Sequence, residues 1–348
     1  MIEQQEKASP LLTVETPLLS VENLRIDVPA GAGTWLTAVD DVTFSIGRGE
    51  TVSLVGESGS GKTLVATSIM GLSQSTGARI VGGSIHFDGR DLTTLPADDW
   101  RKLRGRQMGM IFQQPIRSLN PAFTIGDQIA ESARMHLGLN KKQAKQRAVE
   151  MLDLVKIPRA AERANDYPFS FSGGMCQRAM IAMAMVANPR LLIADEPTTA
   201  LDVTVQAQIL ELITELQAET GVSMLLVSHD LGVVAENCDR VVVMYAGQVA
   251  EEGSVADIFE APRHPYTSAL LGSVAGTIET DRGLRLRTIP GSVPQVGQAP
   301  AGCRFQPRCE FAKSGACDGW QPLLVTAGAD RSVRCARADE LILEGVAS

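Results

Sequence analysis

The feature that most constrains the fold is the octapeptide GESGSGKT, residues 56 to 63. It follows Thr51–Val55, a short β-branched run typical of buried strands, and precedes a helix predicted to begin near Lys62. A buried strand, a glycine-rich turn and a helix are the setting in which the pattern G-x-x-x-x-G-K-[ST] binds phosphate. By chance, the pattern would occur in a chain of this length about once in a hundred sequences. The chain is therefore predicted to contain a phosphate-binding strand-turn-helix unit.

The residue types of this octapeptide, called the phosphate cradle below, each have a physical role. The glycines let backbone N–H groups wrap around the β-phosphate of a nucleotide. Lys62 reaches the β- and γ-phosphates, and the Thr63 hydroxyl can coordinate Mg²⁺. The predicted binding residues are Gly56, Ser58, Gly59, Ser60, Gly61, Lys62 and Thr63.

A second candidate site follows the apolar run Leu191–Ala194, which predicts a central strand. Two carboxylates, Asp195 and Glu196, come directly after this run. An apolar strand that ends in Asp-Glu is common and has little meaning alone. Paired with the phosphate cradle, it predicts a site that combines a metal ion and a general base. Asp195 would lie in the Mg²⁺ coordination shell, and Glu196 would lie nearer the γ-phosphate.

The stretch FSFSGGMCQR, residues 169 to 178, is an unusual beginning for a helix. Ser172 is a good N-cap for the apolar segment Met180–Val186, but Gly173 and Gly174 cost helix stability in the first turn. These residues leave two interpretations open. One is a tight turn, and the other is a helix N-terminus at which an anion approaches bare backbone N–H groups.

Strand-like and helical stretches alternate along the chain, which predicts an α/β fold with a mostly parallel sheet and ligands at the carboxyl ends of its strands. Charged helical sequence from about 100 to 170 predicts a helical insertion, with one helix near Lys141–Val155. After about 287 the chain is rich in Pro and Gly and lacks apolar periodicity. The other predicted strands are Leu18–Val28, Ala38–Ile46, Ser84–Phe87, Ser223–Val227 and Arg240–Tyr245.

Composition excludes some classes of protein. The net charge of −8 argues against nucleic acid as the main partner, since phosphate backbones bind basic surfaces. No apolar run reaches the roughly 18 residues of a membrane span, and the polar start MIEQQEKASP is not a signal peptide. We therefore expect a cytosolic chain whose six cysteines are reduced unless they hold a metal.

Together, GESGSGKT, FSGGM, LLIADEPTTALD and the histidine of VSHD resemble the ATP-binding subunits of ABC transporters, in the order typical of that family and over residues 18 to 255. The resemblance implies a P-loop ABC ATPase core with a mostly parallel sheet, an antiparallel β subdomain and a helical subdomain. It also implies a head-to-tail dimer, in which Ser172, Gly173 and Gly174 contact the γ-phosphate of an ATP in a partner subunit's cradle. That arrangement would explain the two glycines.

The same resemblance implies roles for further residues. Gln113 of IFQQP would sense Mg²⁺ and contact the membrane subunits, and Glu196 would be the general base that polarises the attacking water. Asp202 of TALD would communicate across the dimer. His229 would grip the γ-phosphate; alone it would be a turn histidine that caps a strand, but its place after LLVS favours the functional role.

A narrower resemblance to the oligopeptide/dipeptide importer branch rests on four segments. They are IFQQPIRSLNP, FSGGM with Met175 where many relatives have Gln, HPYT at 264 to 267 before ALLGSV, and the closing cysteine pattern. It implies a bacterial or archaeal inner-membrane importer, with this chain peripheral on the cytoplasmic face. Its partners would be two transmembrane permease subunits, a second ATP-binding subunit and an extracytoplasmic substrate-binding protein. The first alternative is that the same machinery imports nickel, opines or oligosaccharides. The second, less favoured alternative is a soluble ABC ATPase that does not act in transport.

The sequence departs from this branch at a few positions. Cys176 and Gln114 stand where Arg and Asp are usual in this branch. Val28 replaces the aromatic residue expected to stack on adenine, and Trp35, predicted to lie in the following loop, is either its substitute or a solvent-exposed side chain. We expect a loose tail over 1–17, an ABC nucleotide-binding domain over 18–258 with a helical subdomain at about 100–175, and a C-terminal region over 259–348.

Four cysteines cluster in this C-terminal region, with spacings x5, x7 and x17. Structural zinc sites usually contain C-x2-4-C pairs, whereas iron–sulfur clusters tolerate wider spacings. Free thiols would leave the segment without an evident source of stability. The importer resemblance implies a structural 4Fe-4S cluster, expected to lie far from the cradle, with Zn²⁺ as the runner-up; Cys238 is expected to be a small core residue. The proposed ligands are Cys303, Cys309, Cys317 and Cys335.

Overall fold

The computed structural model describes residues 16–31, 33–199, 201–275, 277–280, 283–286, 288–328 and 330–346. Most of the predicted tail over 1–17 lies outside these residues. No helix within them combines the length and apolar character needed to cross a bilayer.

An eight-stranded sheet forms the centre of the molecule, with the order β13-β14-β10-β9-β3-β8-β7-β6. The five strands from β9 to β6 run parallel, and β10, β14 and β13 continue the sheet antiparallel. All residues of β3, β7 and β8 are buried, which is why these segments are mostly apolar and lack the alternation of a half-exposed strand. The predicted α/β class and mostly parallel sheet are confirmed. The strands are β3 (Thr51–Val55), β6 (Met108–Ile111), β7 (Leu191–Asp195), β8 (Ser223–Val227), β9 (Arg240–Tyr245), β10 (Gln248–Ser254), β13 (Val325–Thr326) and β14 (Ser332–Val333).

A second, antiparallel sheet packs beside α1 (Lys62–Ile69) and shares an apolar core with it and with β3. Its order is β2-β1-β4-β5. Trp35 is the first residue of β2 and pairs with Pro29, so its predicted loop position is wrong. The bounds are β1 (Leu19–Pro29), β2 (Trp35–Ile46), β4 (Arg79–Phe87) and β5 (Arg90–Asp91), with the short helix η1 (Ser73–Thr76) between α1 and β4.

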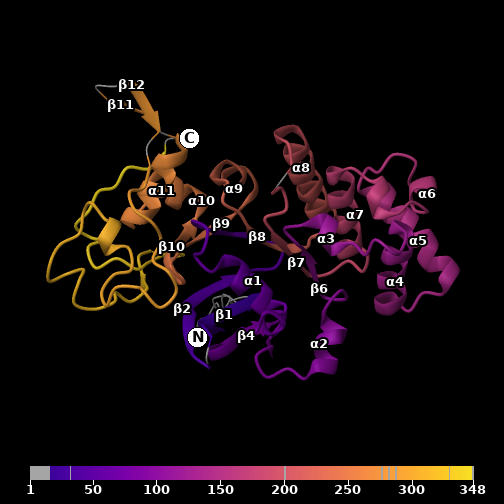
Figure 1. Cartoon of the computed structure of the whole chain (residues 1–348), viewed down its shortest axis with the longest axis horizontal. Coiled ribbons are helices and arrows are strands. Elements are labelled where there is room, and N and C mark those ends of the chain that lie inside the picture. Colours follow the sequence, from indigo (N-terminus) through magenta and orange to yellow (C-terminus); the bar gives the residue numbers. More distant parts are fainter. Residues whose placement is uncertain are drawn as a thin grey trace, which may run out of the picture.

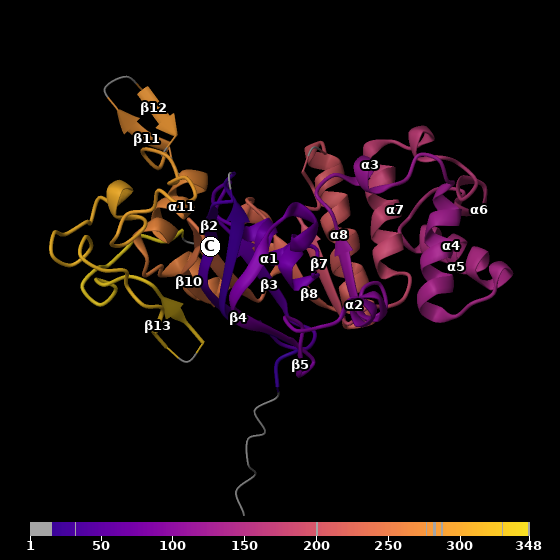
Figure 2. The same cartoon turned by 60° about the horizontal axis from the view of Figure 1, so that its bottom comes forward.

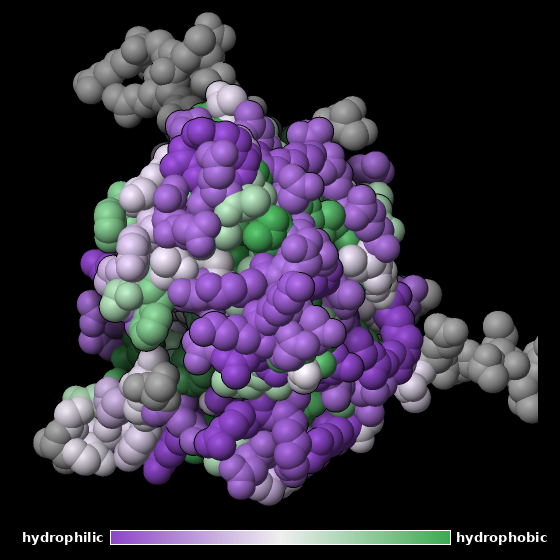
Figure 3. Space-filling view, turned by 90° about the vertical axis from the view of Figure 1, so that its right-hand side faces the viewer, coloured by the Kyte–Doolittle hydropathy of each residue, from purple (hydrophilic) through white to green (hydrophobic). Residues whose placement is uncertain are grey.

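A lobe of helices lies at one end of the molecule, on the right of Figure 1. Its outer face is mostly hydrophilic, with scattered hydrophobic patches (Figure 3). The predicted helical stretch from about 100 to 170 also contains β6, which that prediction missed. The helix α2 (Ala97–Leu103) precedes the lobe and packs through Leu103 and Trp100 against the core shared with the antiparallel sheet. The elements of the lobe are α3 (Pro115–Ser118), α4 (Ile125–Leu137), α5 (Lys141–Leu154), α6 (Ala160–Arg163), η2 (Pro168–Ser170) and α7 (Gly173–Met185).

The C-terminal region lies at the opposite end of the central sheet from this lobe, as Figures 1 and 2 both show. It is joined to the sheet, because β14 pairs with β10 and the buried Arg331 forms an ion pair with Glu251 of β10. Phe305 and Tyr266 share an apolar cluster with Val55, the last residue of β3. The remaining elements are α8 (Val203–Thr220), α9 (Leu231–Asn237), α10 (Val255–Glu260), α11 (Pro265–Ala275), β11 (Thr277–Thr280), β12 (Gly283–Leu286) and η3 (Gln306–Arg308).

Candidate functional site

The phosphate cradle is the loop between β3 and α1, and its glycines are required by its shape. Gly56 has φ +146°, and a Cβ atom there would lie 2.2 Å from the carbonyl oxygen of Met244. Gly61 has φ +100° and is the N-cap of α1. Both conformations are unfavourable for residues with a side chain. The loop therefore presents backbone at the carboxyl end of a central strand, in front of a helix N-terminus.

Lys62 is buried inside this loop. Its Nζ donates hydrogen bonds to the carbonyl oxygens of Gly56 (2.7 Å) and Glu57 (3.0 Å), and lies 3.3 Å from the hydroxyl of Ser60. Burial lowers the pKa of Lys62, and the nearby carboxylates of Glu196 and Asp195 oppose that effect. Ser58 and Gly59 are exposed at the tip of the loop. The loop thus surrounds a cation, which fits the binding of an anionic phosphate chain.

Thr63 and Asp195 meet at the edge of the sheet where the parallel strands end. The Thr63 hydroxyl donates to Oδ1 of Asp195 at 3.1 Å. Asp195 is buried, and this burial, with the neighbouring charge of Glu196, raises the pKa of its carboxyl group. A hydroxyl and a carboxylate are hard oxygen ligands of the kind that Mg²⁺ prefers. The residues present at this corner therefore fit a magnesium ion.

Glu196 is the point at which the predicted catalytic residues converge. Gln113 Nε2 donates to its Oε2 at 2.7 Å, and His229 Nδ1 lies 3.6 Å from its Oε1. The Thr199 hydroxyl also donates to Oε2 at 2.8 Å. Glu196 has φ +46°, a left-handed conformation that is rare for residues other than glycine and is often found at functional sites. The three side chains predicted for catalysis, and Thr199, which the sequence did not single out, therefore form one cluster.

The segment Ser172–Gly174, called the signature below, begins α7 in the helical lobe. Ser172 caps the helix by accepting a hydrogen bond from the Met175 N–H at 3.3 Å. A Cβ atom on Gly174 would lie 2.8 Å from Val205 of α8, whereas one on Gly173 would have only ordinary contacts. Asp202 caps α8 in the same way, accepting from Val205 N–H. Among the described residues, no hydrogen bond or ion pair joins the signature to the cradle of its own chain.

A cavity beside the cradle contains the candidate for adenine stacking. Trp35, Ala38 and Gly59 line it together with Pro294–Gly297 from the C-terminal region. One face of the Trp35 ring is covered by Arg79, whose guanidinium carbon lies 3.8 Å from the ring centroid. Val28, which replaces the usual aromatic residue, packs against the apolar core of the antiparallel sheet.

The four C-terminal cysteines line one cavity, here called the cysteine cavity. Burial, with the neighbouring cysteines, raises the pKa of Cys309 to about 12 and that of Cys335 to about 11. The N–H groups of Lys313 and Arg337 point at the sulfurs of Cys317 (3.5 Å) and Cys335 (3.4 Å). However, nowhere in the ranges described do three or more His, Cys, Asp or Glu side chains form a group that could hold a metal ion.

The two remaining cysteines differ from these four. Cys238 follows α9 and packs beside two apolar clusters, and burial raises the pKa of its thiol to about 12. Cys176 is buried on α7, and burial raises the pKa of its thiol as well. Neither lines the cysteine cavity.

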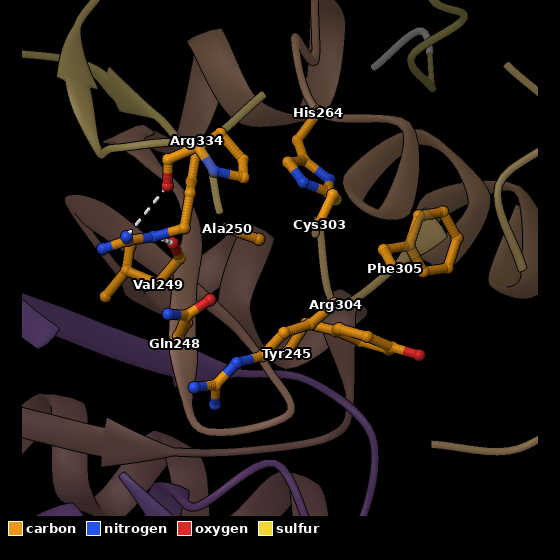
Figure 4. Close-up of a pocket in the computed structure, with 10 residues that line it drawn as sticks. Tyr245, Gln248, Val249, Ala250, His264, Cys303, Arg304, Phe305 and Arg334 are labelled. Atoms are coloured by element: carbon orange, nitrogen blue, oxygen red, sulfur yellow. Dashed lines mark hydrogen bonds between the residues drawn. The ribbon is translucent and has the colours of Figure 1, made fainter. Parts of the chain in front are cut away.

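The C-terminal region that contains the cysteine cavity also contacts the phosphate cradle. Figure 4 shows Cys303 and Phe305 with His264 around a neighbouring small cavity, with Tyr245 at the end of β9 and Arg334 against Val249. Arg308, the residue before Cys309, forms an ion pair with Glu57 of the cradle at 2.6 Å. The C-terminal region thus contacts the nucleotide site directly.

Two family models match the chain. The "ABC transporter" model matches residues 39–199, and the model "Oligopeptide/dipeptide transporter, C-terminal region" matches residues 250–317. The second match includes Cys303, Cys309 and Cys317 and ends before Cys335.

Curated proteins and solved structures resemble the chain over most of its length. It is 50% identical over 320 residues to a peptide import ATP-binding protein of Brucella abortus (strain 2308), a match that covers 92% of this chain and 94% of the relative. It is 52% identical over 303 residues to the oligopeptide transport ATP-binding protein AppD of Bacillus subtilis (strain 168), a match that covers 86% of this chain and 90% of AppD. A solved dimeric ATP-binding cassette, bound to ADP and phosphate after hydrolysis, matches with a TM-score of 0.61 at 28% identity, covering 68% of this chain and 98% of that one.

Proposed function

The chain belongs to the ABC transporter family, among the ATP-binding subunits of oligopeptide/dipeptide importers, and on that premise we propose that it hydrolyses ATP to drive the import of short peptides across the bacterial inner membrane. The observation that carries the chemistry is the cluster of Gln113 and His229 around Glu196, beside Thr63 and Asp195. Fold alone would not specify a reaction, but this group of side chains does.

Each residue of the site has a proposed role in phosphoryl transfer. The cradle backbone and Lys62 hold the β- and γ-phosphates. Thr63, Asp195 and Gln113 would hold Mg²⁺, which neutralises phosphate charge when bound. Glu196 accepts a proton from the attacking water and orients it, and His229 contacts the γ-phosphate. Thr199 keeps Glu196 in place through its hydrogen bond.

The signature is proposed to act on the ATP of a partner subunit. Ser172 and the first-turn N–H groups of α7 form a helix N-terminus that favours an anion. Gly173 leaves its side of the helix open for close approach, and Asp202 begins the adjacent α8. The solved relative bound to ADP and phosphate is dimeric. Two ATP-binding subunits would then close head to tail over two nucleotides.

The cavity beside Trp35 is proposed as the adenine site. It adjoins the cradle at Gly59, and Trp35 offers an aromatic side chain there although Arg79 covers one of its faces. The stretch Pro294–Gly297 would make the C-terminal region part of this site. We retain the division into a nucleotide-binding domain over 18–258 and a C-terminal region over 259–348.

The proposed assembly contains two permease subunits, a second ATP-binding subunit and an extracytoplasmic substrate-binding protein, and no nucleic acid. The chain would lie on the cytoplasmic face of the membrane, bound to the permeases. Among substrates, peptides are favoured, because the two curated relatives are named for peptide import and oligopeptide transport.

The test is ATP-dependent uptake of a radiolabelled oligopeptide into vesicles that contain the assembled importer. Uptake should require ATP and stop in the Glu196→Gln variant. Unlabelled oligopeptide should compete, while nickel, an opine and an oligosaccharide should not. Competition by one of those three and not by peptide would reassign the substrate, and ATP-independent uptake would refute the function.

We also propose that Cys303, Cys309, Cys317 and Cys335 hold a 4Fe-4S cluster, with Zn²⁺ as the runner-up. Support comes from their shared cavity and from the N–H groups that point at two of the sulfurs, a feature common around such clusters. The proposal requires the four side chains to converge when the cluster binds, because in this structure no three of the described metal-ligating side chains form a group that could hold a metal. Burial raises the pKa of the Cys303, Cys309 and Cys335 thiols, so these three would not ionise together without a metal. The cluster would supply folding stability to a region rich in Pro and Gly.

The cluster is tested by metal content. Protein purified anaerobically should be brown and contain iron and sulfide, and Cys309→Ser should remove both. The matched control is Cys238→Ser, whose thiol lies in the apolar core. Colourless protein with stoichiometric zinc would show that the cysteines bind Zn²⁺ and not a 4Fe-4S cluster. Four thiols that react freely with a labelling reagent would exclude both.

A further inference from the structure

We propose that Arg308 is a positioning residue of the phosphate cradle, and that the C-terminal region thereby sets the affinity of the chain for ATP. The inference rests on the proposed function only in taking ATP as the ligand of the cradle. It concerns a residue next to Cys309 that belongs to neither the phosphate-binding motif nor the cysteine set.

The contact between Arg308 and Glu57 is bidentate. Nη1 lies 2.6 Å from Oε2 of Glu57, and Nη2 lies 3.0 Å from Oε1. The Arg308 side chain is only 4% exposed, so water screens the pair little on that side. Arg308 is itself fixed, because it also donates to the carbonyl of Pro290 and to the Tyr245 hydroxyl. Planar, paired hydrogen bonds of this kind are strong and directional.

The backbone of Glu57 is held by the same region. Its N–H donates to the hydroxyl of Tyr266 at 2.9 Å. Tyr266 is fully buried, and its ring packs against those of Tyr245 and Phe305, with centroids 4.6 and 5.3 Å away. Tyr266 and Arg308 thus hold both the main chain and the side chain of the second cradle residue.

Glu57 connects these contacts to the phosphate-binding lysine, because its carbonyl oxygen accepts a hydrogen bond from Lys62 Nζ. Its carboxylate, if unpaired, would place a negative charge beside the triphosphate and repel it. Arg308 neutralises that charge and keeps the carboxylate turned toward the C-terminal region. Loss of Arg308 should therefore weaken ATP binding through both charge and loop position.

The chain contains a matched control. Arg334 also directly precedes a cysteine, is also buried, and also forms an ion pair with a carboxylate of the nucleotide-binding domain, Asp41 at 2.9 Å. Its other partners are the carbonyls of Val249, Pro322 and Asp41, none of them in the cradle. Arg308→Ala and Arg334→Ala thus remove similar anchors, of which only one contacts the cradle.

The experiment measures equilibrium binding of a fluorescent ATP analogue with Mg²⁺ to the full chain. We expect Arg308→Ala to bind about tenfold more weakly, and Arg334→Ala to remain within about twofold of wild type. The double variant Arg308→Ala/Glu57→Gln should recover most of the lost affinity, because the unpaired charge is gone. In the assembled importer, the KM for ATP should rise more than kcat falls.

Equal affinity in wild type and Arg308→Ala would overturn the proposal, and so would equal losses in both arginine variants or no recovery in the double variant. If Arg308→Ala does not fold, Arg308→Lys keeps the charge without the bidentate geometry and should bind about threefold more weakly; unchanged affinity there would also overturn it. Wild type that binds no ATP would instead refute the proposed function.

Discussion

The signature and the C-terminal region lie at opposite ends of the molecule, and they differ in their relation to the phosphate cradle. Among the described residues the signature forms no hydrogen bond with its own cradle, which agrees with the expected role at a partner's nucleotide. The C-terminal region was expected to be a separate structural site, yet its residues Arg308 and Tyr266 hold Glu57 of the cradle. The contact within the chain, and not the signature, is therefore the feature that the sequence did not predict.

The two regions differ because they would act at different stages. Contacts within one chain, such as Arg308 with Glu57, shape the cradle before a nucleotide arrives. Under the proposed function, the signature would act only when a second subunit brings its nucleotide to α7. Variants of the first kind should change ATP affinity, and variants of the second kind should change turnover. The predictions below test this separation, from the largest expected effect to the smallest.

Glu196→Gln should reduce ATP hydrolysis by the assembled importer by about 10³-fold while nucleotide binding survives. Glutamine keeps the shape of the side chain but cannot accept a proton from water. Steady-state phosphate release measures the effect, and ATP should hold the two ATP-binding subunits together during gel filtration. Glu211→Gln, on the exposed side of α8, is the control. Hydrolysis near the wild-type rate would refute the assigned role.

Lys62→Ala should weaken ATP binding by about a hundredfold, because it removes the buried cation that faces the β- and γ-phosphates. Isothermal titration calorimetry with ATP and Mg²⁺ measures the change. Lys145→Ala, an exposed lysine of α5, should bind like wild type. The cradle assignment fails if both variants bind equally well.

Ser172→Arg should leave binding at the chain's own cradle unchanged and reduce turnover in the assembled importer about tenfold. The bulky, charged side chain would occupy the helix N-terminus that a partner's phosphate must approach. Ser170→Arg, two residues earlier and outside the signature, is the matched control. If Ser172→Arg weakened ATP binding at the chain's own cradle and left turnover per bound ATP unchanged, the result would contradict a role of Ser172 at the partner's nucleotide.

Tyr266→Phe should weaken ATP binding about threefold, since it removes the acceptor for the Glu57 N–H and keeps the ring packing. Titration with the fluorescent analogue is sensitive enough to resolve this. Tyr167→Phe, in the helical lobe, should have no effect. An unchanged ATP affinity in Tyr266→Phe would show that the Tyr266 hydroxyl does not help to position Glu57, which would leave Arg308 as the residue that does.

Regular elements with strong local signals could be predicted from the sequence. β3 and β8 were predicted with the bounds that the structure has, because a fully buried parallel strand is a short, mostly apolar and often β-branched run. The predicted N-cap Ser172 is confirmed, because capping depends on nearby residues. β6 was missed, since its four residues follow the polar stretch Arg104–Gln107 and offer too short a pattern.

Contacts between distant segments could not be predicted. Arg308 and Glu57 are 251 residues apart, and the segment around Arg308 has no periodicity that would position it. The hydrogen bond from Thr199 to Glu196 depends on the turn after β7, for which the sequence offers no separate signal. The motif could therefore identify Glu196 and Lys62, while the groups that hold Glu196 and Glu57 required the three-dimensional structure.

The most direct test of this account compares Arg308→Ala and Ser172→Arg in one equilibrium titration of the isolated chain with the fluorescent ATP analogue and Mg²⁺. The account predicts that Arg308→Ala binds about tenfold more weakly than wild type and that Ser172→Arg binds with wild-type affinity. The opposite pattern, with affinity lost in Ser172→Arg and kept in Arg308→Ala, would show that the signature serves its own cradle and that the C-terminal region does not.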